Sequence, residues 1–155
     1  MTESATAYQS VLHRAVDLLA RREHSATELF NKLLQKGFAE ELVESALCEL
    51  KNKNLQSDER FAEAFVNERI RRGYGPIKIQ HELSRKGISQ NLISAYVNQS
   101  SHQWLDLALV QYQKKYQSTA VDNYAEWSKR ARFLQSRGFT MEQIRASINF
   151  DADID

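Results

Sequence analysis

Apolar residues recur along most of this chain at the spacing of one face of an α-helix. Leu12, Ala15, Val16 and Leu19 follow the i, i+3, i+4, i+7 pattern, and comparable stripes return at intervals as far as Ile148. No segment keeps the sustained alternation of apolar and polar residues that is typical of a half-buried strand. The pattern predicts an all-α protein without a sheet.

A glycine-containing motif repeats along the chain at nearly constant spacing. It is Leu-x-x-Lys-Gly-Phe in the first copy, Leu-x-x-Lys-Gly-Ile in the second and Leu-x-x-Arg-Gly-Phe in the third, with glycines 50 and 51 residues apart. Glycine just past a helix takes the left-handed conformation at little steric cost, and a preceding cation complements the helix dipole. The motif predicts three copies of one helical unit, with Gly37, Gly87 and Gly138 in equivalent left-handed positions.

Three helices fill each copy, so we expect nine helices in a tandem array. The expected division is a flexible N-terminus at 1–7, three-helix repeats at 8–54, 55–99 and 100–150, and a tail at 151–155. Helix starts are predicted from capping residues, namely Ser25 with Glu28, Ser57, Ser89, and Thr140 with Gln143. Neighbouring units of this kind stack to bury their apolar faces, which predicts an elongated, curved array with a concave surface.

Composition agrees with a folded protein of the cell interior. The chain is 42% hydrophobic and 26% charged, and it holds no apolar run near the roughly 20 residues that span a bilayer. Met1–Ala7 lacks the pattern of a secretion signal, and the single Cys48 fits a reducing compartment. We therefore expect a cytoplasmic protein with no membrane contact, in which Cys48 is a small buried hydrophobe. The lack of a long heptad seam favours a monomer.

The sequence offers no catalytic, metal-binding or cofactor-binding motif. Its four histidines are scattered without the spacing of metal ligands, and it has neither a phosphate-binding loop nor a nucleophile elbow. Trp104 and Trp127 are expected to be core anchors. These observations favour a binding protein over an enzyme, with no metal and no cofactor.

A net charge of only +1 conceals two basic segments. Six bases stand against Glu82 alone between Arg69 and Lys86, and five stand against Glu142 alone between Lys129 and Arg145. Helix ends and a solvated helix face account for part of this charge, but arginines also pair with carboxylate or phosphate, and a tyrosine in an exposed turn can stack on a partner. The candidate partner-binding residues are Arg69, Arg71, Arg72, Tyr74, Lys78, Arg85 and Lys86, with a secondary basic patch of Lys129, Arg130, Arg132 and Arg137.

Residues 71–88, RRGYGPIKIQHELSRKGI, resemble the central signature of the RecX family, bacterial regulators of RecA recombinase. Weaker similarity in residues 22–33, 58–62 and 133–139 extends the resemblance over nearly the whole chain, apart from Met1–Ala7 and the residues after Phe150. One departure is that Gln56 and Ser57 precede Asp58, where the family usually has an apolar residue followed by two polar or acidic ones. Ser57 still provides a cap, but the packing beneath Gln56 is expected to differ.

The resemblance implies a protein that binds RecA and lodges in the groove of the RecA filament on DNA. There it would limit filament extension, promote disassembly and dampen strand exchange, ATP hydrolysis and coprotease activity, in DNA repair, recombination and the SOS response. The basic and aromatic positions of the second repeat are the contacts that the resemblance implies. An alternative is a stand-alone DNA-binding protein of helix-turn-helix type, although the near-neutral charge argues against tight DNA binding. Weak binding to single- or double-stranded DNA is compatible with RecA binding.

Overall fold

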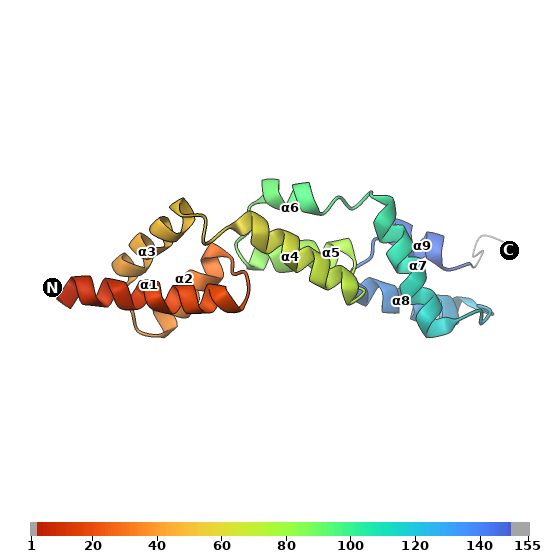
Figure 1. The fold of residues 1–155 in the computed structure, drawn as a ribbon. Helices are drawn as coiled ribbons and strands as arrows, with labels where there is room; N and C mark the ends of the chain where they lie inside the picture. The colour runs from red at the N-terminus through yellow and green to blue at the C-terminus, as the bar shows by residue number, and fades with distance from the viewer. Residues whose placement is uncertain (1–2, 150–155) are drawn as a thin grey trace. The chain divides into compact units, whose positions relative to one another are not determined.

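The computed structural model describes residues 3–149, and within this range the chain forms nine α-helices and no β-strand (Figure 1). The helices are α1 (Glu3–Arg21), α2 (Ala26–Gln35), α3 (Glu40–Asn52), α4 (Asp58–Arg71), α5 (Pro76–Arg85), α6 (Gln90–Tyr96), α7 (His102–Tyr116), α8 (Tyr124–Arg137) and α9 (Met141–Ser147). The prediction of an all-α chain with nine helices is thereby confirmed for this range. None of these helices combines the length and the apolar character needed to cross a membrane.

The N-terminal boundary differs from the expectation. The sequence predicts a flexible segment at 1–7, whereas residues 3–7 form the first turn and a half of α1. Alanine is the strongest helix former, and Ala5 and Ala7 extend the helix beyond Tyr8, which packs against the core of the first bundle. Residues 1–2 of that segment and the tail at 151–155 lie outside the described residues.

The helix starts are formed by the capping residues that the sequence indicates. Ser25 Oγ accepts a hydrogen bond from the Glu28 backbone N–H at 3.1 Å, and Glu28 Oε1 accepts one from the Ser25 N–H at 3.2 Å. The other predicted caps are also formed, by Ser57, Ser89, and Thr140 with Gln143. Each cap satisfies backbone donors that the helix itself leaves free, for about 1 kcal/mol.

The helix ends confirm the predicted equivalence of the three glycines. The φ angles of Gly37, Gly87 and Gly138 are 94°, 81° and 101°. In every copy the residue after the glycine donates its N–H to the carbonyl five residues earlier, at 3.1–3.4 Å. This is the hydrogen bond that closes a helix around a left-handed residue.

The chain divides into two compact units that do not follow the repeat boundaries. One unit comprises the described residues up to Phe65 together with Leu83–Ile93, and the other comprises Val66–Glu82 together with the described residues from Ser94 onward. The helices of the middle repeat, α4, α5 and α6, therefore each contribute to both units.

The core of the first unit lies between α1, α2 and α3, the bundle at the red end of Figure 1. The buried face of α1 carries Val11, Ala15 and Leu18, whereas Val16 is exposed. The apolar face of α1 is thus rotated from the stripe predicted above, because the sequence of α1 allows two overlapping stripes and packing selects one. Cys48 is exposed on α3, which corrects its expected burial.

The core of the second unit lies between α7, α8 and α9, at the blue end of Figure 1. Its buried members are Ala108, Tyr112, Ala131, Leu134, Phe139, Ile144 and Ile148. Trp104 is fully buried and Trp127 packs partly buried against this core, in agreement with their predicted roles as core anchors. Full burial of one large aliphatic side chain contributes about 1.5–3 kcal/mol.

In the first unit, the Lys86–Gly87 turn at the end of α5 packs on the start of α2. The Ser25 hydroxyl that caps α2 also donates to the Lys86 carbonyl at 2.8 Å, and Lys86 Nζ lies 3.1 Å from Glu28 Oε2. A Cβ on Gly87 would overlap the Thr27 side chain, so a larger residue at this turn requires Thr27 to move. The side chains of α2 therefore connect the first repeat to the second.

In the second unit, the Arg137–Gly138 turn at the end of α8 meets the start of α5 in the same manner but through the backbone. Gly75 N–H donates to the Arg137 carbonyl at 2.7 Å, and Ile77 N–H donates to the Gly138 carbonyl at 2.9 Å. These bonds satisfy donors at the N-terminal end of α5 that the helix leaves free. The glycine motif, which the sequence indicates only as a helix stop, therefore also connects the second repeat to the third.

Gln56, which stands where the RecX family usually has an apolar residue, forms specific hydrogen bonds. This side chain is buried, and its Nε2 donates to the His24 carbonyl at 3.2 Å and to Asp58 Oδ1 at 2.9 Å. The same Asp58 oxygen accepts from the Ala26 N–H at 2.8 Å. Gln56 thus replaces apolar packing with polar contacts between the α1–α2 connection and the start of α4, as the altered sequence led us to expect.

Candidate partner-binding surface

The central candidate residues surround the turn between α4 and α5. Gly73 has a φ of 85°, and the N–H groups of Gly73 and Tyr74 donate to the carbonyls of Ile70 and Arg69 at 2.9 and 3.0 Å. These hydrogen bonds end α4, and α5 begins two residues after Tyr74, at Pro76. Tyr74 is half-buried in this turn, so it is less exposed than a glycine-flanked position suggests.

Three cationic side chains lie around the ring of Tyr74. Lys78 Nζ is 4.5 Å from the ring centroid, Arg137 Cζ is 5.5 Å away and Arg69 Cζ is 6.0 Å away. Arg137 reaches the ring because its own carbonyl is anchored at Gly75, and its guanidinium also donates to the Arg72 carbonyl at 3.2 Å. Such contacts contribute about 0.5–1 kcal/mol each at exposed sites. We call Arg69, Tyr74, Lys78 and Arg137 the Tyr74 cluster.

Acidic side chains neutralise part of the charge beside this cluster. Arg69 pairs with Glu82 at 3.0 Å, and each side chain is 22% exposed. Glu68 accepts hydrogen bonds from Arg71 and from Arg72, the latter at 2.9 Å. Glu68 lies directly before Arg69, so the basic segment from Arg69 to Lys86 has a second acid beside it.

Arg71 and Arg72 are the most exposed cations of the second repeat for which an ion pair is formed. Their side chains are 75% and 59% exposed. Exposed pairs of this kind stabilise a protein by about 0–1 kcal/mol, because water and salt screen them. A partner's carboxylate or phosphate can consequently replace Glu68 at little cost.

Two of the seven candidates belong to the other compact unit. Lys86 is held by Glu28 in the first unit, and Arg85 is exposed at the end of α5. The seven candidates are close together in the sequence, but the structure divides them between two compact units.

The secondary basic patch does not form one surface. Lys129 and Arg132 are exposed on α8, whereas Arg137 belongs to the Tyr74 cluster. Arg130 is only 2% exposed, which removes it from any contact surface. Its guanidinium donates to Tyr112 Oη at 2.8 Å and to Glu126 Oε1 at 3.0 Å.

Arg130 instead holds the connection between α7 and α8. It donates to the carbonyls of Thr119 and Ala120 at 2.9 and 3.2 Å, and its Cζ lies 4.6 Å from the Tyr116 ring centroid. A buried charge is tolerated only when it is paired and hydrogen-bonded in this way. Helical spacing alone does not distinguish this arginine from Lys129 or Arg132, because all of its partners except Glu126 come from the preceding helix and loop.

The arrangement is suited to holding an anionic or acidic surface. Arginine guanidinium groups pair bidentately with carboxylate or phosphate. A partner that binds these arginines must displace the acidic side chains that already pair with them. Among the described residues no three His, Cys, Asp or Glu side chains gather as metal ligands would. Sequence reasoning missed that Arg137 joins Tyr74. The available signal was its place in the repeat, which matches that of Lys86.

Comparisons with known proteins give a consistent result. Family models for the first, second and third three-helix domains of RecX match residues 12–50, 57–97 and 102–148. The regulatory protein RecX of Legionella pneumophila is 44% identical over 130 residues, which cover 84% of this chain and 87% of that protein. The regulatory protein RecX of Halorhodospira halophila is 35% identical over 147 residues, or 95% of this chain and 91% of that protein. The crystal structure of RecX from Lactobacillus salivarius shares the fold with a TM-score of 0.78 at 20% identity, over 92% of this chain and 95% of that one.

Proposed function

The chain belongs to the RecX family of regulatory proteins, and from this premise we propose that it binds RecA recombinase and the RecA filament on DNA and restrains the filament. It limits filament extension and lowers the ATP hydrolysis, strand exchange and coprotease activity of RecA. It works in the cytoplasm, as a monomer, in DNA repair and recombination. It acts by binding, without a catalytic step of its own.

The observation that carries this proposal is the match of all three RecX domains, each to one repeat of the chain. The chain also covers most of the length of the curated relatives. A binding role is further supported by the exposed cations Arg71 and Arg72 beside a hydrogen-bonded turn.

The contact surface that we propose is built from Arg71, Arg72 and the Tyr74 cluster in the second unit. Lys129 and Arg132 form a secondary surface on α8 in the same unit. Arg85 and Lys86, in the first unit, make separate contacts. Charge complementarity of this type mainly sets the rate of association and the choice of partner.

The test is the effect of the protein on ATP hydrolysis by RecA on single-stranded DNA. We expect inhibition at amounts well below one molecule per RecA protomer, because a protein bound in the filament blocks further extension. Unchanged hydrolysis at equimolar protein would contradict the proposal.

The surface is tested with two matched triple variants of the second unit. R71A/R72A/K78A removes cations at the proposed contact, and K129A/R132A/R145A removes three exposed cations elsewhere in the unit. The first variant should need about tenfold more protein for the same inhibition and show a weaker salt dependence, since each tenfold corresponds to about 1.4 kcal/mol. Both variants must retain the wild-type melting temperature. Wild-type inhibition by the first together with failure of the second would place the contact on α8 and α9.

Direct binding to bare single- and double-stranded DNA separates the proposal from the helix-turn-helix alternative. Non-specific affinity for DNA falls steeply with salt in proportion to the number of phosphate contacts. Tight binding to bare DNA, with no effect on RecA, would favour the alternative.

A further inference from the structure

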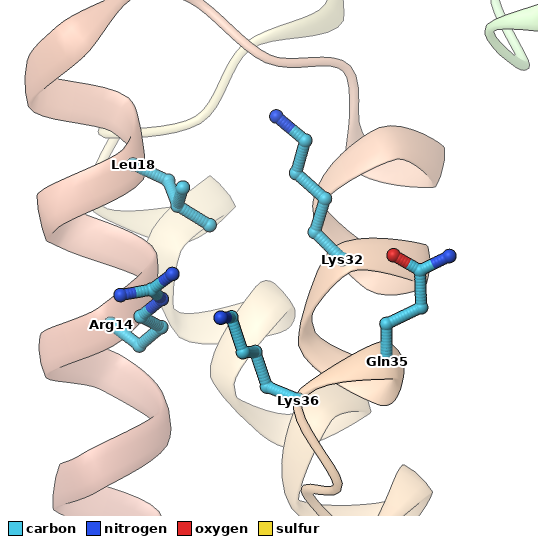
Figure 2. Close-up of a pocket in the computed structure, with 5 residues that line it drawn as sticks. All are labelled: Arg14, Leu18, Lys32, Gln35 and Lys36. Atoms are coloured by element: carbon cyan, nitrogen blue, oxygen red, sulfur yellow. The ribbon is translucent and has the colours of Figure 1, made fainter.

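A cationic pocket lies between α1 and α2 in the first unit, and none of the candidate residues named above lines it. It has a volume of about 420 Å³, and its lining residues are Arg14, Leu18, Lys32, Gln35 and Lys36. Figure 2 shows Arg14 extending from α1 and Lys36 from the end of α2 into the space between the two helices, with Leu18 beside them. Three of the five lining residues are cations and none is an acid, so an anion is the complementary ligand.

Arg14 supplies a hydrogen-bond donor that has no acceptor. Its Nε is buried and makes no hydrogen bond within the described structure. Burying a charged N–H without an acceptor is costly, and native structures rarely keep such a group unless a bound water, ion or ligand satisfies it.

Lys32 is held in place by a buried histidine. Lys32 Nζ lies 3.0 Å from His24 Nε2, and His24 Nδ1 lies 3.0 Å from the Arg22 carbonyl. Nδ1 must therefore carry the histidine proton, and Nε2 accepts from the lysine. Burial lowers the pKa of His24, which keeps the ring neutral and able to accept.

The pocket is short of negative charge. Burial lowers the pKa of Lys32, and Arg22 and Lys86 lower it further, although Glu28 acts in the opposite direction. Glu28 already pairs with Arg22 and Lys86 and accepts a hydrogen bond from the Ser25 N–H. A bound anion would relieve the repulsion among the cations.

We propose that this pocket binds a carboxylate side chain in an acidic segment of the protein partner. The inference rests on the proposed function, in which that partner is RecA. The carboxylate oxygens would accept from Arg14 and Lys36, and the methylene stem of the acidic residue would lie against Leu18. The pocket is thus an additional contact for the same partner, on the unit that lacks the Tyr74 cluster.

A carboxylate fits better than the phosphates of a nucleic acid. The first 56 residues hold eight acids and seven bases, so the pocket is a small cationic site on a balanced surface. A nucleic acid requires a long tract of cations, because its affinity comes from many phosphates neutralised together. A single pocket of this volume, with an apolar side chain in its lining, suits one acidic side chain.

The test uses the full chain and a capped tetra-aspartate peptide, with capped tetra-asparagine as the uncharged control. In ¹⁵N NMR titrations, tetra-aspartate should shift the Arg14 Nε–H resonance and the amides around Lys36, and tetra-asparagine should not. The R14Q/K36Q variant should bind tetra-aspartate at least about tenfold more weakly. The matched control K51Q/K53Q removes two exposed charges at the C-terminal end of α3 and should bind like the wild type.

K36Q alone, a change at an exposed residue, keeps the test valid if the double variant unfolds, and it should weaken binding about threefold. The absence of a shift at Arg14, or equal binding by R14Q/K36Q and the wild type, would overturn the inference. A larger shift with oligothymidylate than with tetra-aspartate would also overturn it, in favour of nucleic acid.

Parallel assays separate this inference from the proposed function. If the wild type inhibits RecA and R14Q/K36Q inhibits equally, the pocket does not contact RecA although the function stands. If the wild type has no effect on RecA but binds tetra-aspartate at Arg14, the pocket binds acidic segments and the partner is a different protein.

Discussion

The two junctions between consecutive repeats use the same glycine turn with different chemistry. In the first unit, the Lys86–Gly87 turn contacts the start of α2 through the side chains of Ser25, Thr27 and Glu28. In the second unit, the Arg137–Gly138 turn contacts the start of α5 through backbone hydrogen bonds of 2.7 and 2.9 Å.

This difference predicts which junction tolerates substitution and responds to pH. Side chains can rotate, be substituted or change their protonation state, so the first junction tolerates some change and responds to pH. Two backbones in contact leave no room for a Cβ, so the second junction requires glycine on both sides. A Cβ on Gly75 would lie 2.5 Å from the carbonyl carbon of Gly138.

The strongest test of this comparison is to add a methyl group to the backbone junction. G75A and G138A should each lower the free energy of unfolding of the second unit by about 3 kcal/mol, because the backbones must separate and Gly138 also has φ 101°. A Cβ on Gly138 would lie 2.7 Å from the Lys78 backbone nitrogen. Trp104 and Trp127 both lie in this unit, so urea denaturation followed by tryptophan fluorescence reports on it.

The matched control is G37A in the first repeat. Gly37 has a φ of 94°, but nothing lies within 4 Å of the Cβ position, because no earlier repeat packs on this turn. G37A should cost only about 1 kcal/mol, the penalty of the left-handed conformation. If G75A costs no more than G37A, the backbone junction is looser than described.

A smaller effect is expected for G87A at the side-chain junction. It should destabilise the first unit by about 2 kcal/mol, from the left-handed φ of 81° and the clash with Thr27. G87A/T27A should recover part of this loss, because removing Oγ1 and Cγ2 leaves only the Thr27 Cβ near the new methyl group. Hydrogen exchange of the α2 amides measures the change. If G87A/T27A is no more stable than G87A, the two junctions do not differ in their ability to adjust through side chains.

The smallest effect is the pH dependence of the first junction. Burial by itself raises the pKa of Glu28, but hydrogen bonds from Arg22, Lys86 and the Ser25 N–H outweigh it and lower the pKa from 4.5 to about 2. Because the fold favours the carboxylate, the stability contributed by Glu28 is complete above pH 4.5 and is lost as the pH falls toward 2.

E28Q should therefore cost about 1 kcal/mol at neutral pH, since Arg22 and Lys86 are partly exposed and screened, and almost nothing as the pH approaches that low pKa. Glutamine still completes a capping box, so the change isolates the charge. Chemical denaturation across this pH range measures the difference, and E49Q serves as a control because its 3.8 Å pair with Lys53 is exposed. A constant difference between E28Q and the wild type at all pH values would contradict the assignment.

Prediction from sequence succeeded where the cause is local. Capping boxes and left-handed glycines depend on groups within about five residues, so Ser25 with Glu28 and Gly138 were predictable. The candidate site was predicted less well. The arginines beside Tyr74 were located correctly on the chain, but their pairing with Glu68 and Glu82 appears only when helix faces are assigned.

By itself the sequence determined the helices, their capped starts and glycine stops, the three repeats and the resemblance to RecX, because these depend on short-range hydrogen bonds, periodicity and motif spacing. Only the tertiary structure decided that Arg130 is interior, that Arg137 completes the Tyr74 cluster and that Arg14 faces a pocket. Arginines on a helix are equivalent in sequence until another segment packs against one of them. Arg137 and Gly75, 62 residues apart, meet only because one repeat closes on the next.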